Sequence, residues 1–181
     1  MLPDGYQVKD PSLDNISAVL NPTFTPAQVT ALSQNPIHPP KPSFDLASKP
    51  YLPGYVGLNN IKANDYLNVV IHALLHVPPL RDYLLLSNLS GNSSQGTKGN
   101  GSTGNPPSTE MLRRFAGLAK KVWNPRLFKA QVSPHEFLQE VARVSGGKFK
   151  ITEQGDPVDF LGWLLNRLHR DMGGTKKRNS C

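Results

Sequence analysis

The sequence predicts a mainly helical fold that follows an extended, proline-rich N-terminal segment. Beyond residue 64, apolar residues recur at helical spacing in several separate segments. Most of these segments begin at a capping residue or a proline and end at glycine or proline. In contrast, nine of the 17 prolines lie within the first 50 residues, which leaves room there for only one short helix.

Composition limits the classes of protein that the chain can belong to. At 181 residues with 38% hydrophobic content it is long enough for one ordinary domain, and its net charge of +7 suits an acidic partner. The single cysteine, Cys181, excludes an internal disulfide framework or a cysteine-based zinc site. No apolar stretch has membrane-spanning length, and the N-terminus lacks a secretory signal pattern. The prediction is a cytoplasmic or nuclear protein.

The N-terminal 50 residues are interpreted as a linker with one helix. Thr25 is the expected N-cap, Pro26 the first helical residue, and Gln28 completes a capping box. The helix should end before Pro36, and the stretch 37–50 should be an extended linker.

The next two helices are expected close together. Asn64 is a suitable N-cap for a helix, and its apolar residues are Leu67, Val70, Ile71 and Leu74. Three consecutive apolar residues at 69–71 leave a buried strand as the alternative, but length and the cap favour a helix. Pro78 and Pro79 should end it and open a second helix that runs through Leu86.

Residues 87–108 form a Ser/Asn/Gly/Thr-rich run without periodicity, which predicts a disordered insertion. A helix should follow from Met111 and end near Asn124 and Pro125. Its apolar stripe is Met111, Leu112, Phe115, Leu118, Ala119 and Val122.

Two more helices are expected near the C-terminus. The first should begin at Ser133 with a capping box to Glu136 and end at glycines 146 and 147. The second should begin at Asp156 with Pro157 and end at glycines 173 and 174. Between them, the alternation over 148–152 suggests a short strand. Residues 175–181 are predicted to be a disordered basic tail.

No catalytic or metal-binding constellation stands out by spacing alone. His72 and His76 lie four residues apart on one predicted helix, a possible metal pair, but no acidic or cysteine ligand accompanies them at a fixed spacing, so an incidental pair is favoured. Asp156 and Asp159 open a helix, where a capping role is the simpler reading. The Gly54-x-x-Gly57 pattern is too short for a phosphate-binding loop.

Residues 56–68 resemble the cysteine box of the ubiquitin-specific proteases, Gly-Leu-x-Asn-x-Gly-x-Thr-Cys-Tyr-x-Asn. The matching positions are Gly57, Leu58, Asn60, Tyr66 and Asn68. In the family this loop delivers a thiolate to a helix N-terminus, and the asparagine helps to hold the oxyanion. The resemblance places Asn60 at the oxyanion position and Asp65 at the nucleophile position, with Lys62 for the family glycine and Asn64 for the threonine.

A second box supports the first. Residues 154–161, Gln-Gly-Asp-Pro-Val-Asp-Phe-Leu, resemble the family's Gln-Gln-Asp-Ala-Gln-Glu-Phe-Leu, which begins another helix of its thumb subdomain. The resemblance narrows to the catalytically inactive branch associated with the splicing tri-snRNP, on five further segments. These are residues 22–25, 77–81, 123–126, 132–136 and 173–177.

The resemblance implies an incomplete papain-like cysteine-protease fold of the ubiquitin-specific protease type. Residues 1–50 correspond to a linker that follows an absent zinc-finger domain, and residues 51–181 to the helical thumb. The family's palm and fingers, with the box that supplies the catalytic histidine, would lie beyond the last residue. A fragment of a larger protein is therefore expected.

Asp65 has two interpretations. An aspartate can be a nucleophile in glycosyl or phosphoryl chemistry, but against an isopeptide bond it would have to form a mixed anhydride while an amine is expelled. The structural interpretation is favoured: a carboxylate at a helix start interacts with backbone N–H groups and the helix dipole. Lys62, in the same loop, is a candidate ion-pair partner.

The resemblance implies a non-catalytic scaffold that acts in pre-mRNA splicing in the nucleus, with spliceosomal or tri-snRNP proteins as partners and no cofactor. The alternative is a ubiquitin-binding module, expected to bind ubiquitin weakly because the fingers that grip its body are absent. Genuine deubiquitinase activity ranks last. No RNP-type aromatic motif or KH loop predicts a specific nucleic-acid site.

Overall fold

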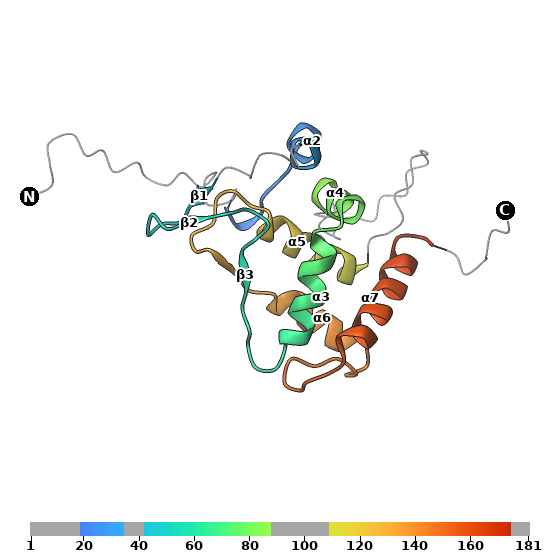
Figure 1. Cartoon of the computed structure of the whole chain (residues 1–181). Helices are drawn as coiled ribbons and strands as arrows, with labels where there is room; N and C mark the ends of the chain where they lie inside the picture. Colours follow the sequence, from blue (N-terminus) through green and yellow to red (C-terminus); the bar gives the residue numbers. More distant parts are fainter. Residues whose placement is uncertain (1–18, 35–41, 88–108, 175–181) are drawn as a thin grey trace, which may run out of the picture.

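The computed structural model describes residues 19–34, 42–87 and 109–174, and within them the fold is mainly helical (Figure 1). The helices in chain order are α2 (Pro26–Gln34), α3 (Asp65–Leu75), α4 (Pro78–Leu86), α5 (Glu110–Val122), α6 (His135–Val144) and α7 (Pro157–Asp171). The mainly helical prediction is confirmed. The predicted insertion, apart from Ser87, and the predicted basic tail lie outside the described residues.

Helices α5 and α6 pack face to face through large aromatic side chains. Phe115 and Phe137 are both fully buried, and their rings stack with centroids 4.8 Å apart. Thr109 caps α5 by accepting a hydrogen bond from the Leu112 backbone N–H, and α5 ends at Val122 near the predicted stop. The α5 stripe predicted from spacing is buried throughout, because α5 packs against both α4 and α6.

Helix α3 lies against α7, with α4 at its C-terminal end (Figure 1). The residues that α3 buries include Leu67, Ile71 and Leu75, which confirms a helix over the alternative strand. On α7, Phe160, Leu164 and Leu168 are buried at a spacing of four residues. Asp156 caps α7 by accepting a 2.7 Å hydrogen bond from the Val158 N–H, as predicted.

Helix α2 belongs to the same packed unit. Its capping box forms as predicted, since Thr25 N–H donates to Gln28 Oε1 at 2.8 Å and Gln28 N–H to Thr25 Oγ1 at 3.3 Å. Val29 is 3% exposed and joins the core, where α2 contacts α4. The predicted boundary at residue 50 therefore marks a change in amino-acid composition, but the packed core contains residues from both sides of it.

Two pairs of very short strands were not predicted. Strands β1 (Ser43–Phe44) and β2 (Pro50–Tyr51) pair antiparallel, so the described part of the predicted linker is a hairpin. Strands β3 (Gly57–Leu58) and β4 (Gln131–Val132) pair parallel across more than 70 residues of sequence. Two-residue strands carry no period that a sequence pattern can display, because alternation needs at least four residues to be recognised.

Two local predictions near α6 are wrong. No strand forms at residues 148–152, where a turn instead buries Phe149 and lets the Ile151 carbonyl accept a hydrogen bond from the Ala63 N–H. The alternation there reflects one side chain that turns inward. Helix α6 begins at His135 with Pro134 at the cap position, one residue later than predicted, and Ser133 Oγ accepts a weak 3.4 Å bond from the His135 N–H.

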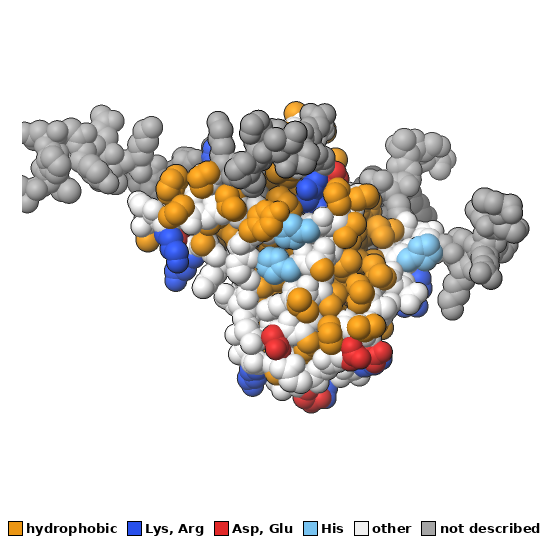
Figure 2. All heavy atoms as spheres, viewed as in Figure 1, with side chains coloured by type: hydrophobic (Ala, Val, Ile, Leu, Met, Phe, Trp, Pro, Cys, Tyr) orange, Lys and Arg blue, Asp and Glu red, His pale blue; other side chains and the backbone are white. Residues whose placement is uncertain are grey.

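One apolar face on the described surface stays open to solvent. Figure 2 shows hydrophobic side chains gathered over α3 and α7. Among them Val158 is 72% exposed, Val69 59% and Leu165 46%. No single described helix is long and apolar enough to cross a membrane, and α3 and α4, which pass by length and composition together, meet at 88°.

Candidate functional site at the start of helix α3

The loop before α3 is organised by one buried asparagine. Asn64 is 0% exposed, and its Oδ1 accepts hydrogen bonds from the backbone N–H groups of Ile61 at 2.6 Å and Lys62 at 3.3 Å. Its Nδ2 donates to the Asn59 carbonyl and to Asn68 Oδ1, both at 3.2 Å. Asn64 occupies the predicted cap position, but its side chain holds the loop and does not cap α3.

Asn68, one helical turn later, extends this network. Its Nδ2 lies 3.3 Å from the Asn59 carbonyl and 3.5 Å from the Leu58 carbonyl, and the residue is 9% exposed. Two asparagines therefore satisfy backbone groups that the loop cannot pair with itself. Both positions match or replace members of the family's cysteine box, so the box has a structural function independent of its nucleophile.

Asp65 is the first residue of α3, and its side chain is exposed. Its Oδ1 accepts a 2.8 Å hydrogen bond from Gln154 Nε2, a residue 89 positions away that opens the second resembling box. Among the ion pairs of the described residues none joins Lys62 to Asp65, so the predicted pairing is not formed. The bond instead links the start of α3 to the segment that leads into α7.

Asn60 and Lys62 take different places in the loop. Asn60 Oδ1 accepts a 3.2 Å hydrogen bond from the Asn64 N–H, which orients the Asn60 side chain against the loop. Lys62 is exposed, and its backbone N–H belongs to the Asn64 network. Lys62 is absent from the described non-glycine residues with positive φ, of which Ser48 is the one member. The loop therefore accommodates a lysine at this position without left-handed backbone geometry.

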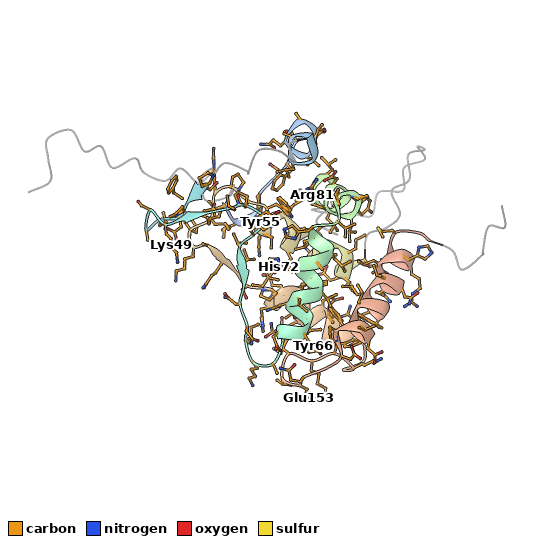
Figure 3. All side chains as sticks on the ribbon, in the orientation of Figure 1. Lys49, Tyr55, Tyr66, His72, Arg81 and Glu153 are labelled. Atoms are coloured by element: carbon orange, nitrogen blue, oxygen red, sulfur yellow. The ribbon has the colours of Figure 1, made fainter. Side chains whose placement is uncertain are left out.

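Tyr66 brings the two resembling boxes into contact. Its ring is 7% exposed and lies edge-on to Phe160, with centroids 6.4 Å apart. A Cβ atom built on Gly155 would lie 2.8 Å from the Tyr66 ring, so this packing requires glycine. Burial, followed by the negative charge of Glu153, raises the pKa of Tyr66, and Figure 3 shows Tyr66 above Glu153 at this end of α3.

A shallow hollow of about 470 Å³ lies beside this loop. Its lining is mostly polar backbone and amide side chains from β3, the loop and β4: Gly57, Leu58, Asn59, Asn60, Ile61 and Gln131. Hydrogen-bonding groups dominate its walls, and no carboxylate, thiol or imidazole of the described residues lines it. The hollow suits contact with polar polypeptide backbone and supplies no acid, base or nucleophile.

His72 and His76 stack with ring centroids 6.0 Å apart. His76 Nδ1 lies 2.7 Å from the His72 carbonyl, and its ring is 4.9 Å from Tyr55 and 5.4 Å from Trp123. Burial, followed by the neighbouring His76, lowers the pKa of His72. No group of three or more metal-ligating side chains exists among the described residues, so the pair has no third ligand.

The arrangement links the start of α3 to the segment that leads into α7. The carboxylate of Asp65 accepts a hydrogen bond from the side-chain amide of Gln154. Asp156 caps α7, and Asp159 forms a 3.6 Å ion pair with Lys148. The sequence reasoning missed Gln154 as a site residue, although its place at the start of the second box was the signal that could have found it.

Comparisons with known proteins identify the family. The ubiquitin carboxyl-terminal hydrolase pattern matches residues 56–181. The chain is 47% identical to the "Probable mRNA-splicing protein ubp10" of Schizosaccharomyces pombe over 97% of this chain and 31% of that protein. It is 49% identical to human "Ubiquitin carboxyl-terminal hydrolase 39" over 98% of this chain and 29% of that protein. The chain spans about a third of the length of the curated relatives it matches.

A solved structure shares the fold. The structure titled "Crystal structure of an essential yeast splicing factor" aligns with 96% of this chain and 38% of that chain, at a TM-score of 0.65 and 28% identity. The predicted fold class, a mainly helical and incomplete part of the ubiquitin-specific protease fold, is confirmed. The chain belongs to the ubiquitin carboxyl-terminal hydrolase family.

Proposed function

We propose that this chain is part of a non-catalytic scaffold protein that acts in pre-mRNA splicing in the nucleus, through proteins of the tri-snRNP or spliceosome. The observation that carries the proposal is the Asp65–Gln154 hydrogen bond at 2.8 Å. At the position where the family resemblance expects a thiolate, the side chain is a carboxylate that links the start of α3 to the segment before α7. The names of the fission yeast relative and of the solved yeast splicing factor support the splicing part of the proposal.

The chemistry of the site argues against hydrolysis. A carboxylate attacking an isopeptide bond would have to expel an amine and leave a mixed anhydride, for which a base and an oxyanion donor are needed. The Oδ1 of Asn60, the proposed vestige of the oxyanion group, accepts from the Asn64 N–H and leaves the Nδ2 donor available, so it is the carboxylate at residue 65, and not Asn60, that disfavours hydrolysis. Lys62, the proposed replacement of the family glycine, adds a positive charge to the loop. We therefore assign no catalytic residue.

Activity is tested directly with a fluorogenic ubiquitin substrate and with a ubiquitin probe that reacts with thiols. The wild-type chain should release no fluorophore above the buffer rate. In a Cys181→Ser background, which removes the chain's own thiol, the Asp65→Cys variant should be labelled slowly by iodoacetamide, because a helix N-terminus lowers the pKa of a thiol, yet not by the ubiquitin probe. Stoichiometric probe labelling of this variant would overturn the assignment of a dead site.

The splicing function is tested by exchange. Replacing the matching third of the fission yeast relative with this chain should sustain splicing of a reporter transcript, and the Asp65→Ala form of the exchanged protein should sustain it equally. Loss of splicing in the Asp65→Ala form alone, with folding intact, would show that the carboxylate does more than link two helices.

The alternative function, a ubiquitin-binding module, is measured by titrating labelled ubiquitin with the chain. Because the polar hollow beside Asn60 is shallow and open, we expect weak binding or none. Saturable binding of ubiquitin that tracks substitutions in the hollow would favour the alternative.

A further inference from the structure

The β1–β2 hairpin and the loop between α5 and β4 form a second exposed surface, away from the start of α3. Figure 1 shows the hairpin projecting beside the helical body, and Figure 3 shows Lys49 pointing outward from it. We name this surface the hairpin patch. It comprises Phe44, Leu46 and Lys49 from the hairpin and Arg126, Phe128 and Lys129 from the loop.

The two halves of the hairpin patch are held together by hydrogen bonds. The Leu46 N–H donates to the Phe128 carbonyl at 3.3 Å. Behind the patch, the buried Tyr51 hydroxyl accepts from the Leu127 N–H at 2.8 Å and lies 3.4 Å from the Asn124 carbonyl. The backbone of the hairpin patch is therefore anchored to the core before any partner arrives, which lowers the ordering cost of binding.

The hairpin patch combines apolar exposure with positive charge. Leu46 is 77% exposed, Phe44 62% and Phe128 45%. Lys49, Arg126 and Lys129 are exposed, and none of them belongs to an ion pair of the described residues. The nearest acidic residue in sequence, Asp45, uses one carboxylate oxygen to accept the Ala47 and Lys49 N–H groups at 2.9 Å.

We propose that the hairpin patch binds an acidic polypeptide segment of a partner protein that also carries leucine or aromatic side chains. Three cations against the single carboxylate of Asp45 leave the hairpin patch with a net positive charge, which calls for a negatively charged partner. Charge complementarity of this kind sets both encounter rate and register. The most exposed of the patch's apolar residues, Leu46, is aliphatic. A peptide has aliphatic and aromatic side chains to bury against it, whereas an oligonucleotide presents only bases, sugars and phosphates. This observation favours peptide over RNA.

The inference deepens the proposed scaffold function, because it names the surface through which this chain would hold a partner. It rests on contacts remote from Asp65, so failure of one proposal leaves the other open. If the chain hydrolysed ubiquitin, the hairpin patch could still bind peptide; if the patch bound nothing, the site would still lack a thiol.

The test uses the whole chain and a fluorescein-labelled peptide that repeats the unit Glu-Leu-Asp-Phe, followed by fluorescence anisotropy. Replacing the acids by glutamine, or the apolar residues by serine, provides two matched control peptides. The paired substitution Lys49→Glu with Lys129→Glu should weaken binding by about tenfold or more, since two contacts at the centre of a small interface are lost. Phe44→Ser with Phe128→Ser should weaken it comparably.

A matched charge control reverses Lys62 and Arg170, two exposed cations outside the hairpin patch that also belong to no ion pair of the described residues. It should change the affinity by less than about twofold once salt screening is equal. Circular dichroism must show unchanged helicity in each variant. The proposal is overturned if the patch variant and the control variant lose equal affinity, or if the glutamine peptide binds as well as the acidic one. It is also overturned if Val69→Ser with Leu165→Ser abolishes peptide binding. Binding of labelled oligouridine without binding of the peptide would overturn it as well.

Discussion

The helix pairs α5–α6 and α3–α7 differ in how completely they close. Between α5 and α6, Phe115 and Phe137 are fully buried and stack, and both helices direct their apolar stripe inward. Between α3 and α7 the contact is as specific, yet Val69 and Leu165 point outward beside it. One pair forms a closed core, whereas the other is packed on one side only.

This difference in packing suggests that the two helix pairs have different roles, one in stability and one in contact with other molecules. Burial supplies the main driving force for folding, so α5–α6 should carry most of the stability. The α3–α7 side contains the polar loop network, the Asp65–Gln154 bond and the open apolar face. An open face of this kind normally marks a contact with further polypeptide.

The largest loss of stability is expected from a substitution in the closed α5–α6 core. Phe137→Ala removes a fully buried ring from the stack with Phe115 and leaves a cavity, at an expected cost of about 3–5 kcal/mol of unfolding free energy. Urea unfolding followed by circular dichroism measures it. Val69→Ala, on the exposed face, is the control and should cost far less. Equal losses for the two variants would contradict the comparison.

The second largest loss of stability is expected from a substitution in the polar loop before α3. Asn64→Ala removes a fully buried side chain that accepts from two part-buried backbone N–H groups and donates to the Asn59 carbonyl and to Asn68, at a cost of about 1–3 kcal/mol. Asn59→Ala removes only an exposed side chain and serves as the control. If Asn64→Ala unfolds no more easily than Asn59→Ala, the network does not support the loop.

Two glycines on the α3–α7 side should change the unfolding free energy in opposite directions when each is replaced by alanine. Gly155→Ala places a Cβ 2.8 Å from the buried Tyr66 ring, so it should lower the unfolding free energy by about 1–3 kcal/mol. Gly162→Ala, inside α7 with no atom within 4 Å of the new Cβ, should raise it by about 0.5–1 kcal/mol. Thermal melts measured side by side test the pair, and the same sign for both would refute it.

A smaller effect depends on pH. Burial, followed by the charge of His76, lowers the pKa of His72 from its ordinary 6.5, so the folded chain binds protons less readily there than the unfolded chain. The resulting stability is present above pH 6.5 and declines as pH falls through the folded pKa. Midpoints of urea unfolding between pH 7.5 and 5 measure the decline, which should be reduced in His72→Gln. An unchanged slope in that variant would contradict the assignment.

The smallest effect on stability should accompany a clear effect on association. The chain should self-associate through the open apolar face, and Val69→Ser with Leu165→Ser should shift sedimentation toward monomer while changing the unfolding free energy by about 0.5 kcal/mol or less. The patch pair Phe44→Ser with Phe128→Ser is the control and should leave association unchanged. A monomeric wild-type chain would show that the face needs no cover.

Much of the fold could be predicted because the signals that start and end a helix lie in the residues next to it. The capping box at Thr25, the cap at Asp156 and the proline at residue 78 all act within one turn, so the sequence itself encodes where those helices begin. The prediction failed at residues 148–152, where an alternating pattern was produced by Phe149 turning into the core. Short irregular segments follow their surroundings and carry no reliable period.

By itself, the sequence determined the positions of the helices, the two boxes that resemble the ubiquitin-specific proteases, and the carboxylate in place of a thiol at residue 65. Only the tertiary structure decided that Gln154 engages that carboxylate, that Gly155 makes room for Tyr66, and that β3 pairs with β4. The physical reason is sequence separation. Helix signals act within a few residues, whereas these contacts join groups more than 70 positions apart, and their partners are chosen by the packing of the whole core.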